Sequence, residues 1–157
     1  MLGLRKKTHS LCTVTAGEVI DITKVNDAAF SQKILGEGFG VIPIDGNISS
    51  PADGTVTDVA ETLHAYCIKS TDGLEILVHI GIDTVSLKGE GFTPFVKTGA
   101  TVKKGSPIAF ADLSAIKNKG LETVTVVAVT NSDILKSFEV HKGTADDASY
   151  PAMTYKI

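Results

Sequence analysis

Two histidines stand out as residues that could do chemistry. His79 lies near the end of the apolar run "LEILVHIGIDT", two residues before Gly81, and His64 lies in "ETLHAYCI", two residues after Thr62. Apolar runs of this kind usually lie in a protein core, where a histidine gains little unless a hydrogen bond satisfies it or a reaction uses it. The pattern alone therefore leaves two interpretations of His79: a core histidine satisfied by a backbone carbonyl, or a reactive residue.

The residue types around the two histidines suit phosphoryl transfer through histidine itself. A neutral imidazole nitrogen is a competent nucleophile near neutral pH, because the reference pKa of histidine is about 6.5. A second imidazole can hydrogen-bond the phosphoryl oxygens and, when protonated, offset their charge. Thr62 would orient the ring of His64, and Gly81 would let backbone approach without a Cβ in the way. Such a transfer needs positioning and a partner protein rather than a deep pocket.

Other chemistries have less support. Zinc normally takes a third or fourth ligand, but Cys67 should point to the opposite face of its strand from His64, and the motif HExxH is absent. No GxSxG motif indicates a hydrolase nucleophile. The stretch "GATVKKGS" resembles a phosphate loop only superficially, since GxxxxGK followed by Ser or Thr is absent. We therefore expect neither a metal nor a cofactor.

A hairpin must bring the two histidines together. The pair Asp72-Gly73 is a turn signal between the two histidine-bearing runs. Because strand side chains alternate between faces, a loop of two or four residues places His64 and His79 on one face, whereas a three-residue loop over 71–73 places them on opposite faces. We expect a loop of even length, with Tyr66, Ile68 and Leu77 on the face of the histidines.

The remaining elements are expected to be short strands. Val, Ile and Thr recur in brief runs cut by Gly, Asp-Gly and Asn. This pattern predicts an all-β fold, a flattened β sandwich or barrel of many short, mostly antiparallel strands with short peripheral helices. We expect one domain over residues 1–157, with residues 1–10 as a flexible N-terminal tail. The expected strands are residues 13–15, 19–22, 40–43, 46–49, 55–59, 64–69, 75–80, 107–111, 123–129 and 152–156, and the expected helices are residues 27–33, 113–117 and 133–135, the last capped by Asp133 or by its competitors Ser132 and Asn131.

Composition excludes several classes of function. The net charge is −3, aromatic residues make up 6%, and Trp is absent, so a nucleic-acid partner has little support. The apolar runs are far shorter than the roughly 20 residues that span a bilayer, and the N-terminus has no secretion signal. We expect a cytosolic protein whose two cysteines, Cys12 and Cys67, are small buried thiols.

The segment "VHIGIDTVSLKGEGF" closely resembles the active-site segment of the glucose-class IIA domains (EIIA, glucose-permease type) of the bacterial phosphoenolpyruvate-dependent sugar phosphotransferase system. "ETLHAYCI" resembles the family's segment with the second histidine, and "AFSQKILGEGFGVIP", "SPADGTV", "VKKGSPI" and "VVAVTNSD" match in family order. "SPADGTV" is less specific, because biotinyl and lipoyl carrier domains share it. A carrier of that type is the weaker interpretation, since the lysine that it modifies is missing from this context.

The resemblance implies a compact β sandwich and a role for each histidine. His79 would accept a phosphoryl group from the histidine phosphocarrier protein and pass it to a cysteine of a IIB domain, which drives sugar uptake with phosphorylation. His64 would stabilise that group, and Thr62 would hydrogen-bond His64. The protein would be cytoplasmic, transiently associated with the membrane permease, and would not bind sugar directly. The alternative is a non-enzymatic regulatory module that binds metabolic enzymes or transporters and is switched by phosphorylation of His79.

The resemblance also implies a docking surface around the histidines. Its apolar positions correspond to Phe30, Leu35, Leu77 and Val85, and its acidic positions, which face basic side chains of the partners, correspond to Asp27 and Asp83. Spacing alone does not separate these roles from local ones, because Phe30 and Leu35 also suit a core, and both aspartates suit caps of the turns that follow them. This chain departs from the family pattern at Ala60, where relatives often carry phenylalanine, and matches poorly over 136–150.

Overall fold

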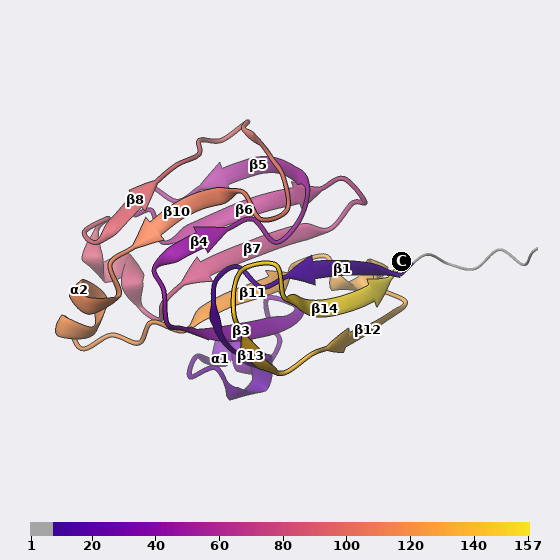
Figure 1. The fold of residues 1–157 in the computed structure, drawn as a ribbon, viewed down its shortest axis with the longest axis horizontal. Helices are drawn as coiled ribbons and strands as arrows, with labels where there is room; N and C mark the ends of the chain where they lie inside the picture. Colours follow the sequence, from indigo (N-terminus) through magenta and orange to yellow (C-terminus); the bar gives the residue numbers. More distant parts are fainter. Residues whose placement is uncertain (1–7) are drawn as a thin grey trace, which may run out of the picture.

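Strands dominate the computed structural model, which describes residues 8–157 (Figure 1). An eight-stranded sheet has the order β13-β2-β3-β11-β7-β6-β5-β9, and two three-stranded sheets have the orders β4-β10-β8 and β1-β14-β12. All pairings among these strands are antiparallel. The strands are β1 (His9–Cys12), β2 (Gly17–Asp21), β3 (Glu37–Pro43), β4 (Asn47–Ser49), β5 (Gly54–Val59), β6 (Ala65–Ser70), β7 (Glu75–Ile80), β8 (Phe92–Pro94), β9 (Thr101–Val102), β10 (Pro107–Ala111), β11 (Thr125–Val129), β12 (Ser137–Val140), β13 (Gly143–Ala145) and β14 (Pro151–Lys156).

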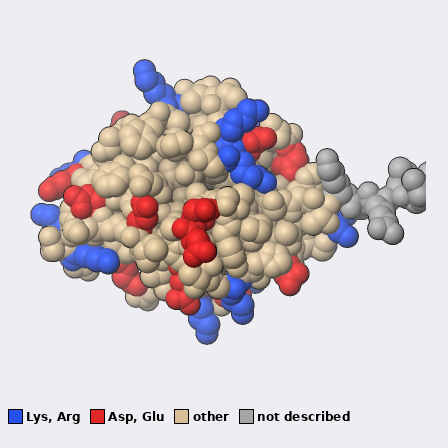
Figure 2. All heavy atoms as spheres, viewed as in Figure 1, with Lys and Arg blue, Asp and Glu red and all other residues tan. Residues whose placement is uncertain are grey.

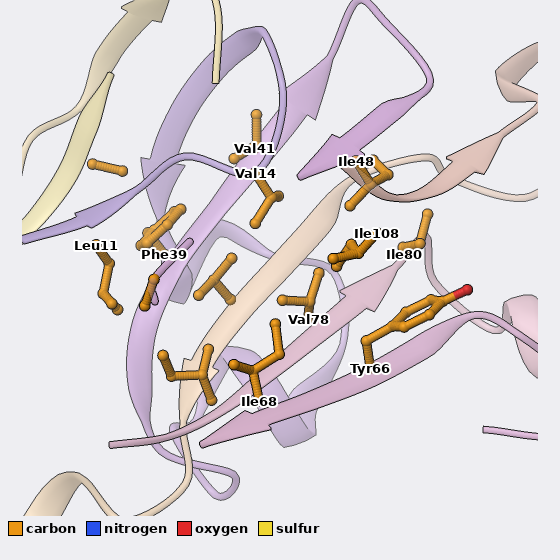
Figure 3. Close-up of a cluster of buried hydrophobic side chains, with 14 of the residues drawn as sticks. Leu11, Val14, Phe39, Val41, Ile48, Tyr66, Ile68, Val78, Ile80 and Ile108 are labelled. Atoms are coloured by element: carbon orange, nitrogen blue, oxygen red, sulfur yellow. The ribbon is translucent and has the colours of Figure 1, made fainter. Parts of the chain in front are cut away.

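The main hydrophobic core lies between the large sheet and the two small ones. Figure 1 shows β4 and β10 lying in front of β6 and β7, and β1 and β14 lying in front of the part of the large sheet that holds β3 and β11. Ile48 and Ile108 from one small sheet and Leu11 from the other pack in a single cluster with Val78 and Tyr66 of the large sheet (Figure 3). The architecture is therefore the β sandwich that the alternating short strands predict.

A second, smaller core covers the outer face of the large sheet. All five residues of β11 are buried, so this strand is covered on both faces. The chain between β2 and β3 supplies the outer cover through η1 (Ile22–Lys24) and α1 (Ala28–Ser31), with Ile22, Val25 and Phe30 packed on Val126 and Ala128. This small core lies beside β7, and it therefore places the α1 segment next to His79.

Short helices follow the predicted positions approximately. Asp27 caps α1, and its Oδ1 accepts a hydrogen bond of 2.9 Å from the Ala29 N–H. The other helices are η2 (Thr84–Leu87), α2 (Leu113–Asn118) and η3 (Ser132–Ile134). The expected cap by Asp133 is wrong, because Asp133 lies inside η3 and Asn131 occupies the cap position without a side-chain hydrogen bond.

Most predicted strands are confirmed, and one is wrong. The predicted bounds of β7 and β10 agree with the structure, and the strands expected at residues 19–22, 40–43, 46–49, 55–59, 64–69, 123–129 and 152–156 differ at one or both ends. Residues 13–15 form no strand, since the Thr13 hydroxyl donates to the Thr15 carbonyl at 2.9 Å and the backbone bends there. Strands β1, β8, β9, β12 and β13 are absent from the prediction.

The β6–β7 hairpin has a three-residue loop, which overturns the expected even loop. Ser70 pairs with Leu74, and Thr71–Gly73 form the turn. Gly73 has φ +99°, and its N–H donates to the Ser70 carbonyl at 3.0 Å, a geometry typical of hairpins whose last loop residue is glycine. Consequently Tyr66 and Ile68 face the core, while Ala65 and Cys67 lie opposite His79 and Leu77 on the outer face.

The N-terminus is described only in part. Residues 1–7 of the expected flexible tail lie outside the described residues, whereas His9 and Ser10 belong to β1. Between residues 8 and 157, no helix is long and apolar enough to cross a bilayer. Figure 2 shows acidic and basic side chains interspersed on the face that carries β4 and β10.

Candidate functional site

His79 lies near the end of β7, on the outer face of the large sheet. Its Nδ1 is 2.8 Å from the carbonyl oxygen of Gly81. A carbonyl can only accept, so Nδ1 carries the proton, and in the neutral ring Nε2 keeps a free lone pair. Gly81 has φ +77°, which turns the chain back so that its carbonyl reaches the ring. The turn thus selects one tautomer of His79.

His64 lies directly against His79. The two ring centroids are 5.0 Å apart with an interplanar angle of 86°, so the rings meet edge to face. The Thr62 hydroxyl is 2.8 Å from His64 Nδ1, which leaves Nε2 for another partner. The His64 side chain is buried, with 8% of the residue exposed. The structure therefore brings together the three residues that the sequence singled out for chemistry.

The rings meet even though the loop is odd, because His64 lies before the regular strand. β6 begins at Ala65, and Leu63 has φ +60°, which is outside the extended region. Alternation of side chains holds only along extended backbone, so it does not fix the direction of His64. The backbone is still tied to β7, since the Ile80 N–H donates to the His64 carbonyl at 2.7 Å. The turn before β6, rather than the hairpin register, aims the His64 ring.

The pKa values of both histidines are lowered. Burial is the main cause at His79, and the neighbouring His64 adds to it, while the Gly81 carbonyl and the carboxylates of Asp27 and Asp83 act in the opposite direction. Burial also lowers the pKa of His64, against the opposing effect of a hydrogen bond with the Thr62 backbone. Both rings are therefore mainly neutral at pH 7, the form in which His79 Nε2 can act as a nucleophile.

The expected apolar docking residues divide into buried and exposed ones. Phe30 is only 2% exposed, and its ring lies 5.1 Å from that of His79 at 61°, so it supports the histidine from the small core and presents little surface. Leu77 is half-buried in the same core. Leu35 and Val85 are exposed, as is Ile34, which the sequence pattern did not single out. Its position beside Leu35 was the only signal that could have found it.

The two expected acidic residues differ in their local roles. Asp27 is partly buried and caps α1, whereas Asp83 is exposed, has φ +59° and makes no capping hydrogen bond with its side chain. Both carboxylates nevertheless act electrostatically on His79.

Cys67 was expected to point away from the histidine face, but it lies opposite Leu77 on the face of His79. Burial, followed by the charge of Asp58, raises the pKa of its thiol.

Comparison with known proteins gives consistent matches over most of the chain. Residues 9–135 match the family model described as phosphoenolpyruvate-dependent sugar phosphotransferase system, EIIA 1. The "PTS system glucose-specific EIIA component" of Halalkalibacterium halodurans is 44% identical over 142 residues, which are 90% of this chain and 82% of that protein.

Two further matches extend the comparison. The "PTS system glucose-specific EIICBA component" of Streptococcus pneumoniae is 47% identical over 135 residues, covering 86% of this chain, which spans only 19% of that protein. The solved structure of glucose permease IIA from Mycoplasma capricolum superposes with a TM-score of 0.84 at 28% identity, covering 98% of this chain and 99% of the other.

Proposed function

Because the chain belongs to the EIIA 1 family of the phosphoenolpyruvate-dependent sugar phosphotransferase system, we propose that His79 is its phosphoryl-carrying residue. The observation that carries this proposal is the hydrogen bond of 2.8 Å from His79 Nδ1 to the Gly81 carbonyl. It directs the free lone pair to Nε2, and the lowered pKa keeps that lone pair unprotonated at neutral pH. His79 is thus prepared as a nucleophile without a separate general base.

The phosphoryl donor is the histidine phosphocarrier protein. The lone pair of His79 Nε2 forms the new N–P bond while the N–P bond of the donor imidazole breaks, and its electron pair returns to the donor ring. The Nδ1 proton remains on His79, held by Gly81. In the next step the thiolate of a IIB-domain cysteine attacks the phosphorus atom on His79. The N–P bond breaks, and its electron pair restores the lone pair of His79 Nε2. In both steps the protein supplies positioning and charge stabilisation.

His64 and Thr62 stabilise the transferred group. In this proposal the Thr62 hydroxyl is the donor in its hydrogen bond of 2.8 Å with His64 Nδ1, so that Nε2 of His64 carries a proton beside the His79 ring. That N–H donates to a phosphoryl oxygen and offsets the charge that arrives with the phosphate. His64 does not itself hold the phosphoryl group, because the Thr62 contact occupies one nitrogen and protonation occupies the other.

The partners follow from the surface around the rings. Exposed Leu35 and Val85 provide apolar contact area, and Asp27 and Asp83 provide negative charge for basic partner side chains. The partner that receives the phosphate is a IIB domain of a glucose-class permease, the class named for the relatives. The chain works in the cytoplasm, associates with that membrane permease only during transfer, and does not contact the sugar.

A second role uses the same surface. Exposed Ile34 and Leu35, which follow α1, and exposed Val85 of η2 form the apolar rim of this proposal. Phosphorylation of His79 would bring negative charge to this rim and change the free energy of any apolar contact made there. Such a rim suits regulated enzymes or transporters that bind only one phosphorylation state. Pull-down experiments with phosphorylated and unphosphorylated protein distinguish this role from transfer alone, because transfer requires no partner that discriminates stably between the two states.

Reconstitution of the transfer chain tests the proposal. With labelled phosphoenolpyruvate, enzyme I and the phosphocarrier, the wild-type chain should gain acid-labile label, and His79→Gln should gain none. His64→Gln should still accept label but should pass it to a IIB domain more slowly, by a factor of about 100 or more. His141→Gln is the matched control, since His141 hydrogen-bonds Thr154 and should behave like wild type. Acid-labile label on His79→Gln would contradict the proposal.

A further inference from the structure

We propose that Thr84 is a positioning residue that holds both histidines in their reactive geometry through the Ile80–Gly81 backbone. Thr84 is completely buried, and its hydroxyl donates to the Ile80 carbonyl at 2.6 Å. This hydrogen bond is made to backbone and to neither histidine ring, so the effect of Thr84 on the rings would pass through the backbone. The inference rests on the proposed role of His79 as phosphoryl acceptor.

Ile80 is the point where the two histidines share one backbone support. Its N–H donates to the His64 carbonyl at 2.7 Å, while its carbonyl accepts from the Thr84 hydroxyl. In a regular antiparallel ladder both groups would bond to the strand opposite. Here the chain turns away before β6, and the Thr84 hydroxyl supplies the bond to the carbonyl. Ile80 is itself fully buried, so that carbonyl would be costly to leave without a partner.

The carbonyl that accepts the hydrogen bond from His79 Nδ1 belongs to Gly81, the residue after Ile80. Its N–H donates to the Val124 carbonyl at 3.0 Å, and the following N–H, of Ile82, donates to the Glu122 carbonyl at 3.1 Å. Thr84 packs against the same turn, because a Cβ placed on Gly81 would lie 2.5 Å from Thr84 Cγ2. The turn that carries the Gly81 carbonyl is thus held by the irregular segment just before β11 on one side and by Thr84 on the other.

Loss of the Thr84 hydroxyl should therefore affect the tautomer of His79. Without this hydroxyl the buried Ile80 carbonyl lacks a hydrogen-bond donor, and the turn shifts so that the carbonyl can reach another donor. A rotated Gly81 carbonyl no longer binds the Nδ1 proton, so the ring also populates the Nε2–H tautomer, which has no lone pair at Nε2. A purely structural threonine would instead change stability alone and leave the tautomer of His79 as it is.

Nitrogen-15 NMR of the unphosphorylated, histidine-labelled protein measures this tautomer directly. Wild type should show His79 as the Nδ1–H form, and Thr84→Val should raise the fraction of the Nε2–H form. Phosphoryl acceptance from the phosphocarrier should fall by about 10- to 100-fold in Thr84→Val. Thr84→Ser keeps the hydroxyl and should restore both readouts. If Thr84→Val does not fold, Thr84→Ala takes its place with the same expected results.

A matched control separates a specific effect from loss of a buried hydroxyl in general. Thr13 is also fully buried, and its hydroxyl donates to a backbone carbonyl, that of Thr15, at 2.9 Å, but it lies between β1 and β2. Thr13→Val should leave the His79 tautomer and the acceptance rate unchanged. An Nε2–H tautomer in the wild type, or an unchanged tautomer in Thr84→Val, would overturn the inference. Failure of the proposed function would show differently, as a wild-type chain that takes no label.

Discussion

At the scale of single residues, proton binding decides whether His79 can play its proposed role as phosphoryl acceptor. A histidine that gains a proton at Nε2 has no lone pair there, so the fraction of neutral ring limits the rate of attack. Burial excludes the charged form, and the ring of His64 disfavours a second positive charge nearby. The carboxylates of Asp27 and Asp83 oppose both effects without reversing them. The site therefore favours neutral imidazole at neutral pH.

The lowered pKa values predict how NMR titration should proceed. The midpoints of His64 and His79 should both fall below the reference value of about 6.5. In His64→Gln the midpoint of His79 should move upward, because one cause of its depression is gone, yet it should stay below the reference because burial remains. A wild-type midpoint for His79 at or above 6.5 would contradict the proposed role of burial.

The same shifts have a definite consequence for stability. Below about pH 6.5 the unfolded chain binds protons at positions 64 and 79, whereas the folded chain binds them only at lower pH. The free energy of unfolding should therefore decrease as the pH falls. Above that pH both states are neutral at these positions, and the contribution to the pH dependence vanishes. Urea unfolding at several pH values should show a flatter acid limb in His79→Gln than in wild type.

At the scale of elements, the turn after β7 is where a backbone requirement and a packing requirement coincide. Gly81 has φ +77°, a conformation that costs other residues about 1–2 kcal/mol. A Cβ there would also lie 2.5 Å from Thr84 Cγ2 and 2.9 Å from the Glu122 carbonyl oxygen, distances that require the turn to move. The glycine thus permits both the bend and the close packing that holds the acceptor carbonyl of His79.

Paired substitutions separate these two requirements. Gly120 has φ +76°, nearly the same value, but nothing lies within 4 Å of the position that a Cβ would take there. Gly120→Ala should cost about 1 kcal/mol from conformation alone, whereas Gly81→Ala should cost at least about 1 kcal/mol more from the clash. Only Gly81→Ala should also slow phosphoryl acceptance. Equal losses of unfolding free energy in urea titrations would show that the packing around Gly81 is loose.

Elements with strong local signals could be predicted, and those defined by their neighbours could not. β7 and β10 are mainly apolar runs bounded by turn residues, and Asp27 is an ordinary helix cap. Edge strands such as β9 and β13 have two or three residues and little periodicity, so only their partners define them. The prediction of the hairpin loop failed for a related reason: one loop residue decides the register, and Asp72-Gly73 fits loops of two or three residues.

The meeting of the histidines was predicted correctly on the basis of a wrong register. Alternation along β6 would have sent His64 toward the core once the loop had three residues. The positive φ of Leu63 removed that restriction, and no sequence pattern signals a leucine in the left-handed region. The residues alone made the pairing depend on the loop length, whereas the turn before β6 decides it.

At the scale of the whole molecule, one polar contact ties a small sheet to the far end of the hairpin. The Tyr155 hydroxyl, on β14, donates to the Asp72 carboxylate, which also accepts from Ser70. His9 of β1 stacks on Tyr155 with centroids 5.5 Å apart, and its Nδ1 lies 3.5 Å from Asp72. Burial, followed by the interaction with Asp72, raises the pKa of Tyr155. This contact lies at the opposite end of β7 from His79.

A second buried tyrosine provides the contrast. Tyr66 is completely buried beside Ile80 and Ile108 (Figure 3), and within residues 8–157 its hydroxyl has no hydrogen-bond partner. Burial raises the pKa of Tyr66 to about 12, as expected for a phenol without a stabilising charge nearby. The two tyrosines thus differ in whether the hydroxyl group makes a hydrogen bond, and this difference matters for stability.

Removing each hydroxyl should therefore have opposite consequences for stability. Tyr155→Phe loses a hydrogen bond to a charged group and leaves Asp72 with one donor fewer, which should lower the free energy of unfolding by about 2 kcal/mol. Tyr66→Phe loses no hydrogen bond and relieves a buried polar atom, so it should be neutral or stabilising by up to about 1 kcal/mol. Urea unfolding at neutral pH measures both, and phosphoryl acceptance should persist in each variant. A substantial loss in Tyr66→Phe would mean that its hydroxyl is hydrogen-bonded in solution, and no loss in Tyr155→Phe would mean that the sheets are held together by the apolar core alone.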